Sequence, residues 1–82
     1  MFYTFVRYMD YKRIEYWFNT YKIKIDPYHL FLGASYDNPD IILYYKNNHI
    51  DVYKEFEHKI ENIATFYKSE RVKQILLQTP SQ

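Results

Sequence analysis

HLFLGASYDNPDIILYYK, residues 29–46, is the stretch of sequence on which the fold depends most. Its two flanks, residues 29–36 and residues 41–46, carry mainly aromatic and branched aliphatic side chains, which are frequent in β-strands. Between them lies DNPD, residues 37–40, whose composition is typical of a tight turn. We therefore expect a β-hairpin, with the second and third strands of a sheet on either side of this turn.

The segment before the hairpin predicts one strand and one helix. Residues 2–9 (FYTFVRYM) are aromatic and β-branched without a breaker, which is typical of a strand. Asp10 follows as an N-cap, and apolar side chains then recur at helical spacing over residues 11–21. The residues of this apolar stripe are Tyr11, Ile14, Trp17, Phe18 and Tyr21. Polar and apolar side chains alternate over residues 22–26, and the Asp26-Pro27 pair is expected to end this segment.

The segment after the hairpin predicts a second helix over residues 50–68, which starts from Asn48 with Asp51 three positions later. The apolar positions that keep the helical period are Tyr53, Phe56, Ile60, Ile63 and Tyr67. Residues 71–78 (RVKQILLQ) fit either a fourth strand or a continuation of the helix. Residues 79–82 (TPSQ) are expected to be a disordered tail.

The order of these elements is strand, helix, strand, strand, helix, strand. This order predicts an α+β, ferredoxin-like βαββαβ fold, in which two helices cover one face of an antiparallel sheet. If residues 71–78 are helical, the expected fold is βαββα with a C-terminal helical extension. In both cases the length of 82 residues predicts a single domain over residues 1–78.

The composition indicates how so short a chain gains stability. It contains no cysteine, which excludes disulfides, thiolate zinc sites and cysteine nucleophiles. It does contain eleven Tyr, six Phe and one Trp, and each buried ring removes roughly 150–250 Å² from water. The tyrosines expected in the core are Tyr8, Tyr11, Tyr21, Tyr53 and Tyr67.

The charge of the chain is close to balanced, with eleven Lys and Arg against ten Asp and Glu. Strong nucleic-acid binders usually carry a basic excess, which is absent here. The apolar run at residues 2–6 is too short for a signal segment or a membrane span. We therefore expect a cytoplasmic protein that does not bind membranes.

The expected sheet leaves one face without helices. Residues 2–9 and 41–46 would lie side by side at its centre, with alternate side chains on the open face. Arg7 and Lys46 are unsuited to a core, so they and their alternating neighbours are assigned to that face. The expected partner-binding residues are Tyr3, Phe5, Arg7, Ile42, Tyr44 and Lys46.

Three uses of such a patch are open. It can become the core of a homodimer or be covered by the C-terminal segment, because an exposed aromatic patch is unfavourable on a soluble monomer. It can bind another protein, since Tyr and Arg are enriched at interface hot spots. It can stack single-stranded nucleic acid, although residues 41–46 lack the glycine of the RNA-recognition consensus.

The sequence shows no recognisable catalytic apparatus, and we expect no cofactor and no metal. Gly33 is the only glycine, which excludes phosphate-binding loops, dinucleotide loops and nucleophile elbows. His29, His49 and His58 are not part of a paired metal-ligand motif. The small residues Gly33-Ala34-Ser35 permit a close backbone approach, or a bulge, within the second strand. Packing of a bulky neighbour such as Trp17 over them is favoured above pairing of a partner's backbone along this edge strand.

Asp10, at the end of the first expected strand, gives a resemblance to the Cas2 and VapD group of small ferredoxin-like proteins. In that group an acidic residue after the first strand can serve a metal-dependent nuclease. The resemblance rests on strand order and this one carboxylate. The stretch Arg7-Tyr8-Met9-Asp10 departs from the group, because no aspartate directly follows the tyrosine. An N-cap role for Asp10 is favoured over a metal site, which needs further ligands.

The leading functional hypothesis is a non-enzymatic protein-interaction module, either a homodimer or a small inhibitor that blocks a host protein. Few Gly and Ala beside many Lys, Ile, Asn and Tyr are typical of AT-rich coding, as in many phages and plasmids. The alternative is a single-stranded nucleic-acid-binding domain that uses an aromatic sheet face. A metal-dependent nuclease ranks below both.

Overall fold

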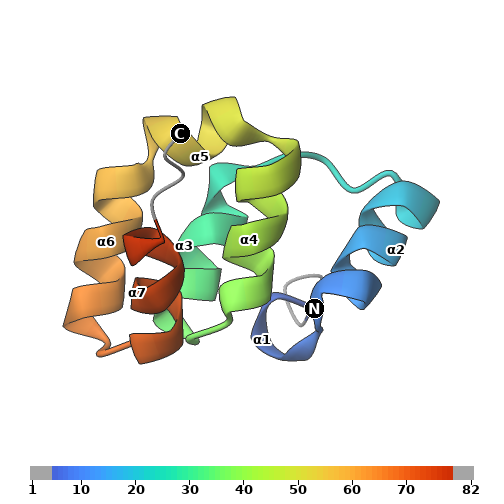
Figure 1. The fold of residues 1–82 in the computed structure, drawn as a ribbon. Helices are drawn as coiled ribbons and strands as arrows, with labels where there is room; N and C mark the ends of the chain where they lie inside the picture. The colour runs from blue at the N-terminus through green and yellow to red at the C-terminus, as the bar shows by residue number, and fades with distance from the viewer. Residues whose placement is uncertain (1–4, 79–82) are drawn as a thin grey trace.

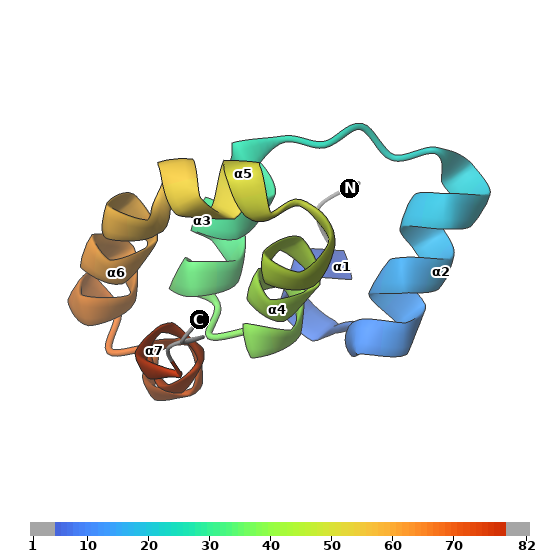
Figure 2. The ribbon, with the colours of Figure 1, turned by 45° about the horizontal axis from the view of Figure 1, so that its top comes forward.

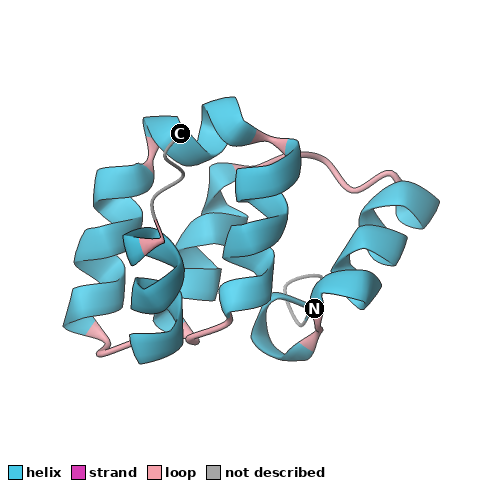
Figure 3. Cartoon of the chain, viewed as in Figure 1, coloured by secondary structure: helices cyan, strands magenta, loops and turns pink. Residues whose placement is uncertain are grey.

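Seven helices joined by short turns make up the described part of the chain, residues 5–78 of a computed structural model (Figure 1). Residues 1–4 and 79–82 lie outside it, the expected tail included, and only the backbone of Phe5 is described. No strand occurs between residues 5 and 78 (Figure 3). The expected α+β ferredoxin-like fold is therefore wrong in both its βαββαβ and its βαββα form.

The helices are short and follow one another closely along the chain. Their bounds are α1 (Phe5–Tyr8), α2 (Tyr11–Tyr21), α3 (Pro27–Ser35), α4 (Pro39–Asn48), α5 (Ile50–Glu55), α6 (Glu57–Phe66) and α7 (Glu70–Leu77).

The two strands of the expected hairpin are α3 and α4. Each helix begins at a proline, Pro27 or Pro39, and proline suits the first helical position because no N–H is needed there. The preceding Asp26 accepts the Tyr28 N–H at 3.0 Å. In the same way Asn38 Oδ1 accepts the Asp40 N–H at 3.0 Å. Both Asx-Pro pairs are thus capped helix starts. The segments that follow Asp26-Pro27 and Asn38-Pro39 are therefore helices and not the expected strands.

The first expected strand, residues 2–9, is also wrong, because residues 5–8 form α1. The helix expected over residues 11–21 is confirmed as α2. Asp10 is its N-cap and accepts the Arg13 N–H at 3.0 Å. Lys22 ends the helix in the left-handed conformation at φ 52°.

The helix expected over residues 50–68 is confirmed as helical but is divided at Phe56 into α5 and α6. Its expected start is wrong, because Asn48 is the last residue of α4. Of the two alternatives for residues 71–78 the helix is confirmed, since Glu70–Leu77 forms α7.

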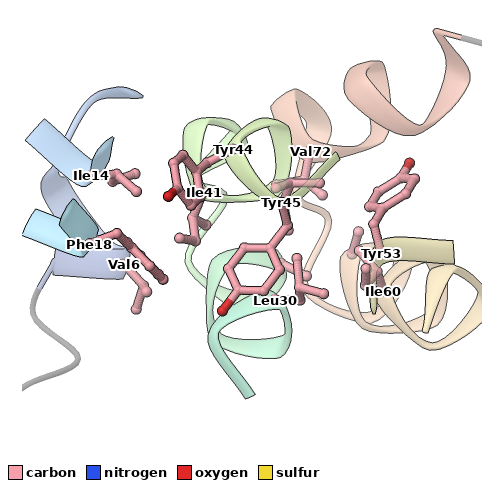
Figure 4. Packing of buried hydrophobic residues seen from close by; sticks show 13 residues of the cluster. Val6, Ile14, Phe18, Leu30, Ile41, Tyr44, Tyr45, Tyr53, Ile60 and Val72 are labelled. Carbon is pink, nitrogen blue, oxygen red and sulfur yellow. The ribbon is translucent and has the colours of Figure 1, made fainter. Parts of the chain in front are cut away.

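Helix α4 lies at the centre of the molecule. It packs against α2 on one side and against α3 and α7 on the other, as Figure 2 shows. Figure 4 shows the core that results, with side chains of α1 and α2 meeting α4 from one direction and those of α3, α5, α6 and α7 from the other. The α4 residues that are buried on these sides are Ile41, Ile42, Tyr44 and Tyr45.

Gly33 allows α3 and α4 to approach closely. A Cβ atom at this position would overlap Ile41 Cγ2 and would touch Ile42 Cδ1 at 3.4 Å. A bulky neighbour therefore packs over this small residue, as expected, but it is Ile41 of α4 and not Trp17, and the contact lies between two helices rather than on a sheet.

Helix α7 is held at its start by the turn between α3 and α4. Asp37 adopts φ 57° in this turn, and its Oδ1 accepts the Val72 N–H at 3.0 Å. Arg71 Nη2 donates to the Asp37 carbonyl oxygen at 2.9 Å. The buried Ser69 hydroxyl donates to the Ala34 carbonyl oxygen. These bonds fix the α6–α7 turn next to the α3–α4 turn.

Candidate interaction surface

The six residues expected to bind a partner do not form one surface. Ile42 is fully buried in α4, and Tyr44 is only 5 % exposed. Both lie in the core because α4 is surrounded by other helices. Tyr3 lies outside the described residues, and the side chain of Phe5 is not described. The open sheet face that would have brought them together does not exist in residues 5–78.

Lys46 has a structural role at the end of α7. Its Nζ donates to the Gln78 carbonyl oxygen at 2.7 Å and lies 3.5 Å from that of Ile75. A lysine placed on the last carbonyl groups of a helix satisfies acceptors that have no partner within that helix. Lys46 thereby joins α4 to α7.

The tyrosines divide differently from the sequence-based expectation. Tyr53 is buried, as expected, and Tyr11 is half-buried. Tyr8, Tyr21 and Tyr67 are exposed, so their assignment to the core is wrong. The hydrophobic stripe of a helix does not distinguish a ring that faces the core from one at the stripe's wet edge.

A buried polar group joins the α2–α3 linker to the central helix. Tyr45 Oη accepts the Asp26 N–H at 3.1 Å, lies 3.2 Å from the Asp26 carbonyl oxygen and lies 2.7 Å from His29 Nδ1. All three contacts are satisfied when His29 carries its proton on Nδ1 and Tyr45 donates to the Asp26 carbonyl, which is the tautomer we assign.

The chemistry of this polar group is that of a structural anchor. Burial lowers the pKa of His29, although the nearby charge of Asp26 opposes this effect. Burial also raises the pKa of Tyr45. Both side chains are therefore neutral near pH 7, and each proton is held in a hydrogen bond.

The α3–α4 turn lies between α1 and the α6–α7 turn at the bottom of Figure 1, and all three of these segments carry exposed aromatic residues. Tyr8 is 73 % exposed, Tyr36 45 %, Phe66 77 % and Tyr67 56 %. The aromatic end, as we call this surface, consists of Arg7, Tyr8, Tyr36, Phe66, Tyr67 and Arg71.

The contacts within the aromatic end order its side chains. The Arg7 guanidinium carbon lies 4.7 Å from the ring centroid of Tyr36 and 5.2 Å from that of Tyr8. Both distances are in the range of a cation–π contact. The rings of Phe66 and Tyr67 meet edge to face at 5.0 Å.

Sequence reasoning found only one member of the aromatic end, Arg7. Tyr8 and Tyr67 each stand beside a basic residue, in the pairs Arg7-Tyr8 and Tyr67-Lys68, and Tyr36 directly precedes the α3–α4 turn. Such pairs at helix ends are a signal that the sequence offers. Their convergence on one surface depends on the packing of α3, α6 and α7.

A hollow of about 340 Å³ lies beside the α2–α3 linker and is lined by Trp17, Tyr21, Ile23 and Lys24. The rings of Trp17 and Tyr21 meet at 5.2 Å. The lining is aromatic and aliphatic apart from the lysine, which suits a binding contact more than a reaction.

Asp10 is the N-cap of α2, as favoured from the sequence. Over residues 5–78 no three side chains of the His, Cys, Asp and Glu types lie together in a way that could hold a metal ion. His58 is exposed on α6, which confirms the expectation of a solvated face. No helix in this part of the chain combines the length and the apolar character that crossing a membrane requires.

Comparison of the chain with protein-family models, with curated proteins and with solved structures found no match.

Proposed function

We propose that the protein is a cytoplasmic, non-enzymatic protein-interaction module that binds its partner through the aromatic end. The observation that carries the proposal is that three neighbouring segments of the fold, α1, the α3–α4 turn and the α6–α7 turn, each carry exposed aromatic rings, with Arg7 in contact with two of them. Tyr and Arg are the residue types most enriched at binding hot spots, together with Trp. Exposed aromatic surface is also costly to leave in water.

The partner is either another protein or a second copy of this chain. A small inhibitor that covers a site on a host protein is a special case of the first. Stacking of single-stranded nucleic acid is disfavoured, because the aromatic end also carries Asp37 and lies next to the exposed Glu70. A phosphate backbone would meet these negative charges.

The oligomeric state separates the two kinds of partner. We would compare the wild type with the double variant Phe66→Ser/Tyr67→Ser by light scattering. If a second copy covers the aromatic end, the wild type is a dimer and the variant a monomer. If the wild type is a monomer, a different protein is the partner, and a dimer that persists in the variant would place the dimer contact elsewhere.

Site-specific photo-crosslinking tests the proposal directly. A benzophenone side chain would replace Tyr36 or Tyr67, with Tyr16 as the matched control because it is an exposed tyrosine of α2 outside the aromatic end. We expect one cross-linked protein from positions 36 and 67 and none from position 16. Binding of the purified partner should fall about 30-fold in Phe66→Ser/Tyr67→Ser, as for the loss of a hot-spot aromatic residue, and not in Tyr16→Ser.

Two results would contradict the proposal. One is the same set of products from all three positions, which would indicate contact without specificity. The other is a partner whose binding is unaffected by Phe66→Ser/Tyr67→Ser.

A further inference from the structure

We infer that Arg7 is the receptor for a carboxylate, so that the partner presents an acidic side chain next to an apolar one. This inference rests on the proposed function and names the chemistry of the partner at the aromatic end.

Arg7 is held in place by two rings. Its guanidinium lies over Tyr8, its neighbour in α1, and over Tyr36, which ends α3. Contacts of this kind hold the guanidinium by its positive charge without an acceptor atom for its N–H groups, so these donors remain for another partner. The rotamer entropy that an arginine normally loses on binding is thereby reduced in advance.

The charge of Arg7 is not neutralised within the described part of the chain. Its side chain makes no hydrogen bond or ion pair with another residue of that part. The nearest acidic residues in the sequence and in the adjoining turn are committed elsewhere. Asp10 Oδ1 caps α2, and the two carboxylate oxygens of Asp37 take the Val72 N–H and the Arg71 Nε–H. An exposed guanidinium with five N–H donors therefore remains for an external anion.

The surroundings favour a carboxylate of a protein over the phosphates of a nucleic acid. Nucleic-acid binding draws its affinity from several phosphate contacts, and of the two arginines of the aromatic end only Arg7 is without an ion pair within residues 5–78, because Arg71 is paired with Asp37. Tyr8 and Tyr36, whose rings contact the guanidinium, are themselves exposed and offer apolar surface beside it. A single acidic residue with an apolar neighbour satisfies both features, which is the usual composition of a small interface with a polar rim.

The test uses two short probes of defined sequence at low ionic strength. They are the N-acetylated, C-amidated peptides Glu-Glu-Phe-Glu-Glu and Gln-Gln-Phe-Gln-Gln, titrated into labelled protein while the Arg7 Nε–H resonance and the Tyr36 amide are followed by NMR. We expect the Glu peptide to shift both signals, and the Gln peptide to leave the Arg7 Nε–H signal in place.

Matched variants separate a specific site from general attraction. Arg7→Gln should weaken binding of the Glu peptide about fivefold, as for one exposed Arg–carboxylate pair, while Arg13→Gln removes an equal charge from α2 and should change it less than about twofold. Arg7→Lys keeps the charge but loses the planar fork, so it should fall between the two. Unchanged circular dichroism would show that the exposed variants remain folded.

Three outcomes would overturn the inference: no shift of the Arg7 signal, equal losses in Arg7→Gln and Arg13→Gln, or tighter Arg7-dependent binding of hexathymidylate. Its failure is distinguishable from that of the proposed function. If a partner is cross-linked but its affinity does not change in Arg7→Gln, the protein is an interaction module in which Arg7 does not bind a carboxylate. If the Glu peptide binds Arg7 but no protein is cross-linked, Arg7 binds carboxylates and the proposed interaction module is contradicted.

Discussion

Asn38 Nδ2 donates to the carbonyl oxygen of Val6 at 2.9 Å, across 32 residues of sequence. The same amide group lies 3.3 Å from the Met9 carbonyl oxygen, while Asn38 Oδ1 caps α4 by accepting the Asp40 N–H. One buried side chain therefore starts the central helix and also fixes α1. Since α1 carries Arg7, Asn38 supports the aromatic end.

Asn38→Asp should destabilise the protein by roughly 1–3 kcal/mol, measured by urea unfolding. The aspartate keeps the cap oxygen but replaces the donor with a carboxylate oxygen that faces two carbonyl groups. Asn62→Asp, an exposed change of the same kind on α6, is the control and should stay within about 0.5 kcal/mol. Equal effects of the two substitutions would show that the bonds to α1 contribute nothing.

Gly33→Ala should also destabilise, by roughly 1–3 kcal/mol, because the added methyl group would overlap Ile41 Cγ2. The direction is informative, since replacing glycine by alanine inside a helix normally stabilises by about 1 kcal/mol. In the double variant Gly33→Ala/Ile41→Ala the clash is relieved. We therefore expect a loss smaller than the sum of the two single losses, and simple additivity would argue against the contact.

The success and failure of the sequence-based expectations have one physical cause. In α2 one face is wet, so Ile14 and Phe18 are buried while Lys12 and Arg13 are exposed, and the helical period is visible. In α4 four of the five residues of the apolar run 41–45 are buried and Leu43 is half-buried, and a run that is apolar throughout has no period that separates a helix from a strand.

The stronger signals for α3 and α4 were local. Asp26-Pro27 and Asn38-Pro39 each combine a capping side chain with a residue that suits the first helical turn. Both pairs were expected to precede strands, whereas each of them begins a helix. Local signals could not place the parts of the candidate site relative to one another, because the turns that follow α3 and α6 are brought together only by the bonds of Ser69 and Arg71.

Tyr45→Phe should cost roughly 1–3 kcal/mol in unfolding free energy, because it leaves the Asp26 N–H and His29 Nδ1 without their shared partner. Tyr53→Phe is the matched control. Its hydroxyl makes one long contact with Glu57 at 3.5 Å, so its removal should cost clearly less. A loss in Tyr53→Phe as large as that in Tyr45→Phe would indicate that the polar anchor is not important.

The lowered pKa of His29 predicts a dependence of stability on acid. The folded protein favours neutral His29, so this contribution is complete above the usual pKa of 6.5 and is lost as the pH falls through the lower folded value. The melting temperature of the wild type should fall between pH 8 and pH 5. His29→Gln should have a lower melting temperature at pH 8, but its melting temperature should change less with pH.

His58→Gln is the control for this pH profile, because His58 is exposed on α6. It should leave the slope unchanged. A His29→Gln protein whose profile parallels that of the wild type would show that other groups cause the acid sensitivity.

The capping of α7 by Asp37 has a consequence for the order of assembly. The first turn of α7 takes its acceptor from a residue 35 positions earlier, while Ser69 binds Ala34 and does not cap its own helix. During translation the α3–α4 turn leaves the ribosome first, and the last helix can dock only onto a turn that is already formed. Nascent chains that have not reached α7 lack Arg71 and the bonds that Arg71 and Val72 make to Asp37, so a partner that requires the α6–α7 turn in its place would recognise only protein whose synthesis has passed this point.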